Sequence, residues 1–120
     1  MTKNTAIIGA SSKPERYAYL ATLSLLKHGH KVFPIGLREG MIGNEFILTN
    51  RPQLADIDTV TLYVGPQHQE VWADYIFSLK PKRLIFNPGT ENPVLLQEAE
   101  KRGIECVEAC TLVMLSIGNY

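Results

Sequence analysis

The residues best suited to chemistry lie together in one short segment near the N-terminus. This segment runs Gly9-Ala10-Ser11-Ser12-Lys13-Pro14-Glu15-Arg16 and joins an apolar run to a helical pattern. Where a strand meets a helix, free backbone N–H groups and the helix dipole favour a phosphate. Ser11 and Ser12 can donate hydroxyl hydrogen bonds, and Lys13 and Arg16 add positive charge. The segment is therefore predicted to bind a phosphate, and the alternative is a tight turn with a solvated lysine and arginine.

A second segment, after the next apolar run, discriminates between nucleotides. Only the first glycine of the dinucleotide fingerprint G-x-G-x-x-G is present, at Gly9, so the evidence for NAD is weak. An NAD site usually has an acidic residue about 20 positions further on. This chain instead has Arg38, followed by the acidic Glu39. An arginine suits a phosphorylated ribose, as in NADP or the 3′-phospho-ADP of coenzyme A (CoA), although the two residues could also be an exposed charged pair.

The elements that must position these residues alternate short apolar runs with longer helical patterns. Such alternation predicts a parallel sheet with helices on both faces, and continuous apolar runs suit strands that are buried on both sides. A chain of 120 residues is about the size of one domain. We expect a single doubly wound α/β domain with a mainly parallel, five-stranded sheet, its strands at residues 6–8, 31–35, 59–64, 83–86 and 104–107.

Three helices are predicted from apolar periodicity and from their start and stop signals. Those signals are Gly29 after the first helix, Gly65-Pro66 and Pro81 around the second, and Asn92-Pro93 and Gly103 around the third. The first helix is expected over residues 17–28. One side of the second is expected to carry Val71, Trp72, Tyr75, Ile76 and Leu79.

Two further segments have weaker patterns. Between Gly36 and Asp58, residues 46–48 are expected to form a short edge strand and residues 52–55 one helical turn. The apolar residues 111–117 are expected to cover the sheet edge or to pair with a second subunit. Together with the leucine-rich first helix, they make a homodimer a possible assembly.

In an open parallel sheet the ligand crevice lies beyond the carboxyl ends of the strands, where the strand order reverses. The loops that follow the strands are therefore the place to expect a site. They comprise residues 9–16, 36–43, 65–67 and 87–90 and the segment after Val107.

The chain also resembles one known family in a series of motifs. These are Ile7-Ile8-Gly9-Ala10-Ser11, Lys13-Pro14-Glu15-Arg16, Leu26-Lys27-His28-Gly29-His30-Lys31-Val32-Phe33-Pro34, Leu54-Ala55-Asp56-Ile57, Asn87-Pro88-Gly89-Thr90-Glu91-Asn92 and Gly103-Ile104-Glu105-Cys106-Val107. In order and spacing they resemble the small stand-alone CoA-binding domain proteins. Those are Rossmann-type modules similar to the CoA-binding domain of the succinyl-CoA synthetase alpha subunit. The resemblance covers nearly the whole chain and implies a Rossmann-like fold.

The resemblance implies a site for CoA or an acyl-CoA that is bound without turnover by this chain alone. The implied residues are Gly9, Ala10, Ser11, Ser12, Lys13 and Arg16 around the phosphates, Pro34, Gly36 and Arg38 beside the adenosine, and Gly65, Pro66, Asn87 and Gly89 closing the crevice. The chain departs from the family pattern at three places. Val64-Gly65 lacks the family's arginine, Asn87-Pro88-Gly89 replaces Gln-x-Gly, and Ala109-Cys110 replaces Arg-Cys.

No residue is assigned a catalytic or metal-binding role. His28 and His30 flank Gly29 on the side opposite the crevice and are expected at the surface. His68 lies near the crevice and is expected to be an exposed residue at the start of a helix. Cys106 is expected in the core. Cys110 is expected near the crevice mouth, where its thiol could form a mixed disulfide with the pantetheine thiol of CoA.

Charge is balanced in total but not along the chain. The 12 Lys and Arg residues equal the 12 Asp and Glu residues, which argues against the uniformly basic surface that nucleic-acid binding needs. Residues 1–40 nevertheless hold six basic residues against Glu15 and Glu39, a net charge of +4 in the part of the chain that carries the predicted phosphate loop. This distribution favours a compact polyanion as ligand.

The remaining expectations concern location and alternative functions. No apolar stretch is long enough to span a bilayer, no leader pattern is present, and two cysteines do not make a disulfide framework, so we expect a cytoplasmic protein without membrane or nucleic-acid partners. Two other functions stay open. One is an NAD(P)-binding oxidoreductase, and the other is a partner-binding module whose nucleotide crevice is empty.

Overall fold

Apolar runs with both faces buried form the central sheet of the computed structural model, which describes residues 2–120. The strands are β1 (Thr5–Ile8), β2 (Val32–Ile35), β5 (Thr59–Leu62), β6 (Arg83–Phe86) and β7 (Glu105–Glu108). They are all parallel and lie in the order β2-β1-β5-β6-β7. Every residue of β1, β5 and β6 is buried. The predicted five-stranded, Rossmann-like doubly wound domain is confirmed, with small shifts at the strand ends.

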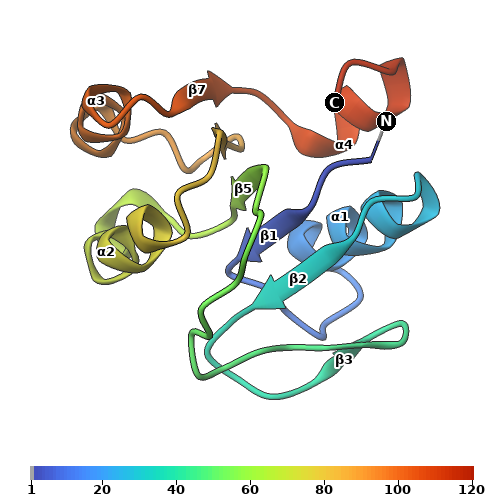
Figure 1. Cartoon of the computed structure of the whole chain (residues 1–120). Helices are drawn as coiled ribbons and strands as arrows, with labels where there is room; N and C mark the ends of the chain where they lie inside the picture. The colour runs from blue at the N-terminus through green and yellow to red at the C-terminus, as the bar shows by residue number, and fades with distance from the viewer. Residues whose placement is uncertain (1) are drawn as a thin grey trace.

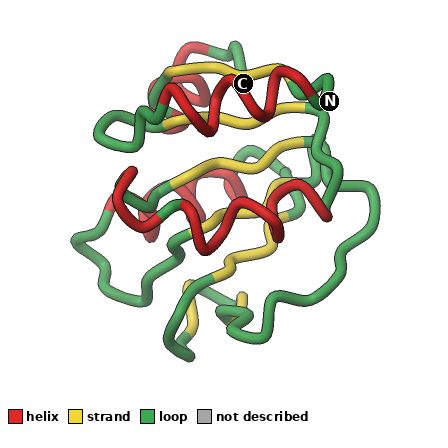
Figure 2. Tube along the Cα trace, turned by 90° about the vertical axis from the view of Figure 1, so that its left-hand side faces the viewer, coloured by secondary structure: helices red, strands yellow, loops and turns green. Residues whose placement is uncertain are grey.

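Helices cover both faces of the sheet (Figure 1). On one face lie α1 (Tyr17–Lys27) and α4 (Thr111–Ile117), and on the other lie α2 (Glu70–Ser78) and α3 (Pro93–Lys101). Figure 2 shows the strands running between these two layers.

Within residues 2–120, no helix is long and apolar enough to cross a membrane.

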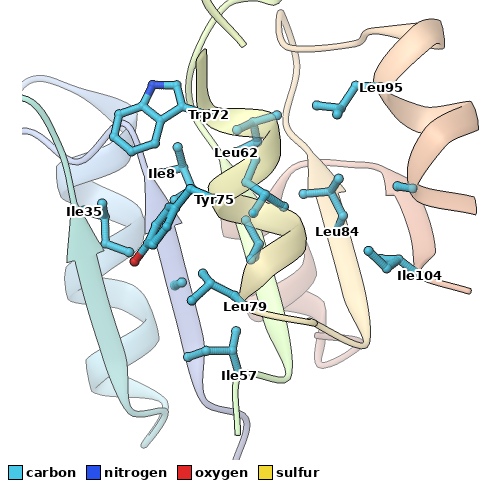
Figure 3. Close-up of a cluster of buried hydrophobic side chains, with 14 of the residues drawn as sticks. Ile8, Ile35, Ile57, Leu62, Trp72, Tyr75, Leu79, Leu84, Leu95 and Ile104 are labelled. Atoms are coloured by element: carbon cyan, nitrogen blue, oxygen red, sulfur yellow. The ribbon is translucent and has the colours of Figure 1, made fainter. Parts of the chain in front are cut away.

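The core divides into two clusters because neighbouring strand residues point to opposite faces of the sheet. Ile7 of β1 packs in the cluster that contains Leu25 of α1. The next residue, Ile8, belongs to the larger cluster on the other face, with Trp72 and Tyr75 of α2 (Figure 3). Burying both faces of β1 fixes the position of its carboxyl end, from which the predicted phosphate loop begins.

Local start and stop signals set the boundaries of α3 as predicted. The Asn92 side chain accepts hydrogen bonds from the backbone N–H groups of Val94 (3.1 Å) and Leu95 (3.2 Å), which would otherwise lack acceptors. Pro93 is the first helical residue, and Gly103 ends the helix in a left-handed conformation with φ of +80°.

The segment between β2 and β5 differs from the prediction. Instead of an edge strand at residues 46–48, a two-stranded antiparallel hairpin forms from β3 (Met41–Ile42) and β4 (Glu45–Phe46). Leu48 makes only an isolated parallel bridge with Ile35. The helical turn expected at residues 52–55 does not form. The Tyr75 hydroxyl instead donates to the Pro52 carbonyl (2.7 Å) and holds this stretch as a loop against α2.

The second helix begins later than predicted. A short 3₁₀ turn, η1 (Pro66–His68), comes first, and the α-helical part starts only at Glu70. Val71 is 66% exposed rather than in the core, because it lies outside the stripe of helical positions formed by Trp72, Tyr75 and Ile76. Trp72, Tyr75 and Ile76 are buried as predicted.

The C-terminal apolar segment forms α4 beside α1 rather than covering a sheet edge. Met114 and Leu115 are buried, whereas Val113 and Ile117 are exposed, as are Leu20 and Leu23 of α1. Part of the segment's apolar surface is therefore used within the chain, and the homodimer stays a prediction.

His30 is buried at 8% exposure, and the expectation that it lies at the surface is wrong. Its ring packs edge-on against Tyr120 with ring centres 4.9 Å apart. Its Nδ1 accepts a hydrogen bond from the backbone N–H of Lys3 (2.9 Å). Burial lowers the pKa of His30 below its usual 6.5, and the positive charge of Lys3 adds to this effect. The folded protein therefore holds the ring in its neutral form.

This burial predicts that acid weakens the fold through His30. Because the unfolded chain binds a proton at His30 near pH 6.5 and the folded chain only at lower pH, the stabilising contribution is complete above pH 6.5 and is lost as the pH falls below it. The unfolding free energy, measured by chemical denaturation, should fall from about pH 7.5 to about pH 5.5, and the fall should be larger for the wild type than for His30→Asn. The asparagine does not titrate, and its amide oxygen can replace Nδ1 as the acceptor. Equal losses in the two proteins would contradict the assignment.

Candidate functional site

A cleft opens where the strand order reverses, between the carboxyl ends of β1 and β5. The chain leaves β1 for α1 on one face of the sheet and leaves β5 for α2 on the other, so the two connections diverge. The cleft has a volume of about 900 Å³ and is lined by the loops that follow β1, β2, β5 and β6. The sequence indicated these four loops and also the segment after Val107, which is not part of the lining.

The floor of the cleft is the loop from β1 to α1, and it offers unused backbone donors. The N–H groups of Gly9 and Ala10 both donate to the Ile35 carbonyl (2.9 Å each), which ties the loop to the end of β2. Ser11 and Ser12, and the first-turn residues 17–19 of α1, donate from their backbone N–H groups to no acceptor within residues 2–120. No side chain caps this helix and its first turn contains no acidic residue. The arrangement suits an anion.

Three cationic side chains line the same cleft, those of Lys13, Arg16 and Arg38. In the part of the chain that the structure describes, the one ion pair joins Arg102 and Glu98, at 3.4 Å. The three cations are therefore not neutralised by close contact with a carboxylate, although Glu39 also lines the cleft. An uncompensated cluster of this kind attracts a multiply charged anion.

Three glycines allow the loops to pack this closely, and two of them lie outside the β1–α1 loop. Gly9 has a φ of +95°, and a Cβ there would lie 2.8 Å from the Tyr63 carbonyl oxygen. A Cβ on Gly36 would lie 2.6 Å from the Ala10 carbonyl oxygen. A Cβ on Gly40 would lie 2.8 Å from the Cβ of Ser12. The β1–α1 loop has only the first glycine of the dinucleotide fingerprint, and Gly36 and Gly40 in the loop after β2 provide the close backbone approach instead.

The opposite wall is built from the loops after β5 and β6 and is held by buried amides. Gly65 and Gly89 line the cleft, but Asn87 does not. Asn87 is 2% exposed and donates to the Thr61 hydroxyl (2.7 Å) and the Leu62 carbonyl (2.9 Å). Its Oδ1 accepts from the backbone N–H of Thr111 (2.9 Å). Its side chain is thus turned into the fold, where it joins β5, β6 and α4.

Most of the predicted site residues come together in the cleft. The lining includes Gly9, Ala10, Ser11, Ser12, Lys13, Arg16, Arg38, Gly65 and Gly89. Four others lie behind or beside it. Pro34 is buried in β2, Gly36 packs against Ala10, Pro66 begins η1, and Asn87 braces the wall from within.

The sequence did not identify several apolar residues of the lining, namely Tyr17, Leu37, Ile47, Tyr63, Val64, Val71 and Trp72. Their position directly after strands or in the first turn of a helix was the available signal. Tyr63 stands out because its hydroxyl is buried without a hydrogen-bond partner within residues 2–120. Burial raises the pKa of Tyr63, so this hydroxyl stays protonated.

Of the His68, Cys106 and Cys110 side chains considered for chemistry, one lines the cleft and two do not. His68 lines the cleft and is exposed. Cys110 is half-buried and is not part of the lining. Cys106 is half-buried rather than fully buried in the core, and burial raises the pKa of its thiol to about 11, which leaves it unreactive at neutral pH. Among residues 2–120, no group of three His, Cys, Asp or Glu side chains is arranged to hold a metal ion.

The fold and the cleft together define a Rossmann-like ligand-binding domain. A family model described as "CoA binding domain" matches residues 3–116. The chain therefore belongs to the CoA-binding domain family. No curated protein matches the chain.

Solved structures support the same fold. An uncharacterized protein with a crystal structure is 49% identical, with a TM-score of 0.98, and the match covers 100% of this chain and 99% of that one. A hypothetical protein from Pyrococcus horikoshii OT3 is 26% identical, with a TM-score of 0.85 and coverage of 96% and 82%. A conserved hypothetical protein from Pyrococcus furiosus is 26% identical, with a TM-score of 0.80 and coverage of 92% and 97%.

The close approach at Gly9 predicts a large loss of stability on adding one methyl group. Gly9→Ala combines a left-handed backbone with a contact of 2.8 Å to a carbonyl oxygen, and it should lower the unfolding free energy by about 3 kcal/mol. The control is Gly103→Ala, where φ is +80° but nothing lies within 4 Å of the added methyl, and about 1 kcal/mol is expected. Chemical denaturation measures both. Equal losses would show that the loops are free to separate.

Proposed function

We propose that this chain binds CoA or an acyl-CoA non-covalently in the cleft between the ends of β1 and β5. The observation that carries the proposal is the uncapped N-terminus of α1 facing a cleft that three unpaired cations line. Membership of the CoA-binding domain family supports it. The size of the cleft, about 900 Å³, is in the range that protein pockets for small ligands occupy.

The phosphates of the ligand fit the end of the cleft at α1. Free N–H groups of Ser11, Ser12 and the first helical turn can donate to the pyrophosphate, while Lys13 and Arg16 neutralise it. We assign to Arg38, which lines the cleft in the loop after β2, the ribose phosphate that distinguishes CoA from NAD. Glu39, the next residue, also lines the cleft.

The side chains that line the cleft support a role in binding without turnover. His68 is the one imidazole in the lining within residues 2–120, and it has no hydrogen-bonded carboxylate or hydroxyl partner among them. General acid–base catalysis needs such a partner to orient and activate the base. The geometry therefore favours holding a ligand over transforming it.

Calorimetric titration with CoA, acetyl-CoA, dephospho-CoA, NADP, NAD and ADP tests the proposal. Binding of CoA and acetyl-CoA in preference to the dinucleotides is expected, with weaker binding of dephospho-CoA because it lacks the phosphate assigned to Arg38. Preference for NAD or NADP would support an oxidoreductase instead. No binding of any of them would support a partner-binding module.

The same titration on variants tests the placement of the phosphates. Lys13→Ala and Arg16→Ala should each weaken CoA binding roughly tenfold, since a charge-assisted phosphate contact contributes about 1.5 kcal/mol. The double variant should also show a smaller dependence of affinity on salt. Lys80→Ala/Lys82→Ala is the matched control, because these exposed lysines line a separate hollow of about 490 Å³ outside the cleft. Unchanged affinity in Lys13→Ala/Arg16→Ala would contradict the placement.

A further inference from the structure

Gln69 is a fully buried polar side chain beside the cleft that the proposed function does not use. It lies between η1 and the first residue of α2 and is 1% exposed. Burying a carboxamide is costly unless all its groups are hydrogen-bonded. Its partners therefore indicate what the residue does.

The side-chain hydrogen bonds of Gln69 join three segments, and two of these lie more than 20 residues away in the chain. Its Nε2 donates to the Val64 carbonyl (2.8 Å) in the loop after β5 and to the Thr90 carbonyl (2.7 Å) in the loop after β6. Its Oε1 accepts from the side-chain amide of Asn92 (3.0 Å), the residue that caps α3. One side chain thus connects two loops and the start of a helix.

Those two loops form the wall of the cleft that lies away from the phosphate loop. Val64 and Thr90 both line the cleft, and so do their neighbours Gly65 and Gly89. A Cβ on Gly89 would meet nothing within 4 Å, so no packing restrains that one residue of the loop. Asn87 ties the start of this loop to β5 and α4, and Gln69 supplies the side-chain hydrogen bonds that join it to the loop after β5.

We propose that Gln69 is a positioning residue that sets the distance between the β5–α2 and β6–α3 loops and thereby the width of this end of the cleft. The inference rests on the proposed function, and it assigns to Gln69 control of affinity for the part of the ligand beyond the nucleotide. The nucleotide itself is held by the α1 end of the cleft and is independent of Gln69.

Only a carboxamide satisfies the three contacts at once. Leucine has nearly the same volume but leaves two buried carbonyl groups without donors, so the loops can separate to reach water. Glutamate has the same shape but, when ionised, presents only acceptors to two carbonyl oxygens. Protonation of that glutamate returns one donor, so the defect in Gln69→Glu should be smaller in acid.

Affinity for a whole and a truncated ligand tests the proposal. Gln69→Leu should bind CoA on the order of tenfold more weakly than the wild type, whereas binding of adenosine 3′,5′-bisphosphate should change by less than about twofold. Gln97→Leu, at an exposed position of α3 outside the cleft lining, is the matched control and should bind both ligands as the wild type does. Equal weakening of both ligands by Gln69→Leu would overturn the proposal, because it would indicate general loosening of the domain.

Amide hydrogen exchange without ligand gives a second, independent readout. The backbone N–H of Thr90 donates to the Asn87 carbonyl, and that of His68 donates to the Gly65 carbonyl, each within one of the two loops. Both amides should exchange roughly tenfold faster in Gln69→Leu and in Gln69→Glu than in the wild type. At about pH 5, the difference between Gln69→Glu and the wild type should become smaller. Unchanged exchange would overturn the bracing role whatever the ligand results. If the wild type binds neither CoA nor the bisphosphate, the proposed function and the role of Gln69 in ligand affinity are both overturned. Faster amide exchange in the variants would then still support the role of Gln69 in holding the two loops together.

Discussion

Three loops meet backbone to backbone where the strand order reverses, and the site depends on how closely they can approach. The reversal between β1 and β5 sends α1 and α2 to opposite faces and so opens a cleft. At its floor there is no space for side chains, because a Cβ on Gly9 or on Gly36 would lie within 2.8 Å of a neighbouring carbonyl oxygen. Because glycine stands at both positions, the floor of the cleft consists of backbone with unpaired amide donors. The same close contacts fix the N-terminus of α1 relative to the ends of three strands.

Charge is then distributed unevenly along the cleft, and this distribution supports the proposed ligand. Lys13, Arg16 and Arg38 gather at the end formed by β1 and β2, whereas the wall after β5 and β6 consists of uncharged residues such as Val64, Gly65 and Pro88. CoA has a matching asymmetry, since its nucleotide half carries the phosphates and its pantetheine arm is uncharged. A ligand with charge at both ends would leave one end without counter-charge.

The sequence predicted most of the fold because each strand is a continuous apolar run and because helix ends carry glycine, proline or asparagine. The hairpin of β3 and β4 escaped prediction since two-residue strands produce no periodic pattern. Within the site, Lys13 and Arg38 could be predicted because they lie in the loops that follow the first two strands. The amides could not, since nothing in the sequence shows whether Asn87 or Gln69 faces a ligand or the fold. His30 was misplaced for the same reason, because its partners Lys3 and Tyr120 are distant in the chain.

The most direct test of the account is a titration of the ¹⁵N-labelled protein with CoA, followed residue by residue through its amide resonances. We predict that the largest shifts fall on Ser11, Ser12, residues 17–19 and Arg38, with saturation at one equivalent of CoA. Residues 54–58, 78–80 and 82, which line the separate hollow outside the cleft, should not shift. Shifts centred on that hollow, or no shifts with CoA at all, would contradict the assignment of the cleft as a CoA site.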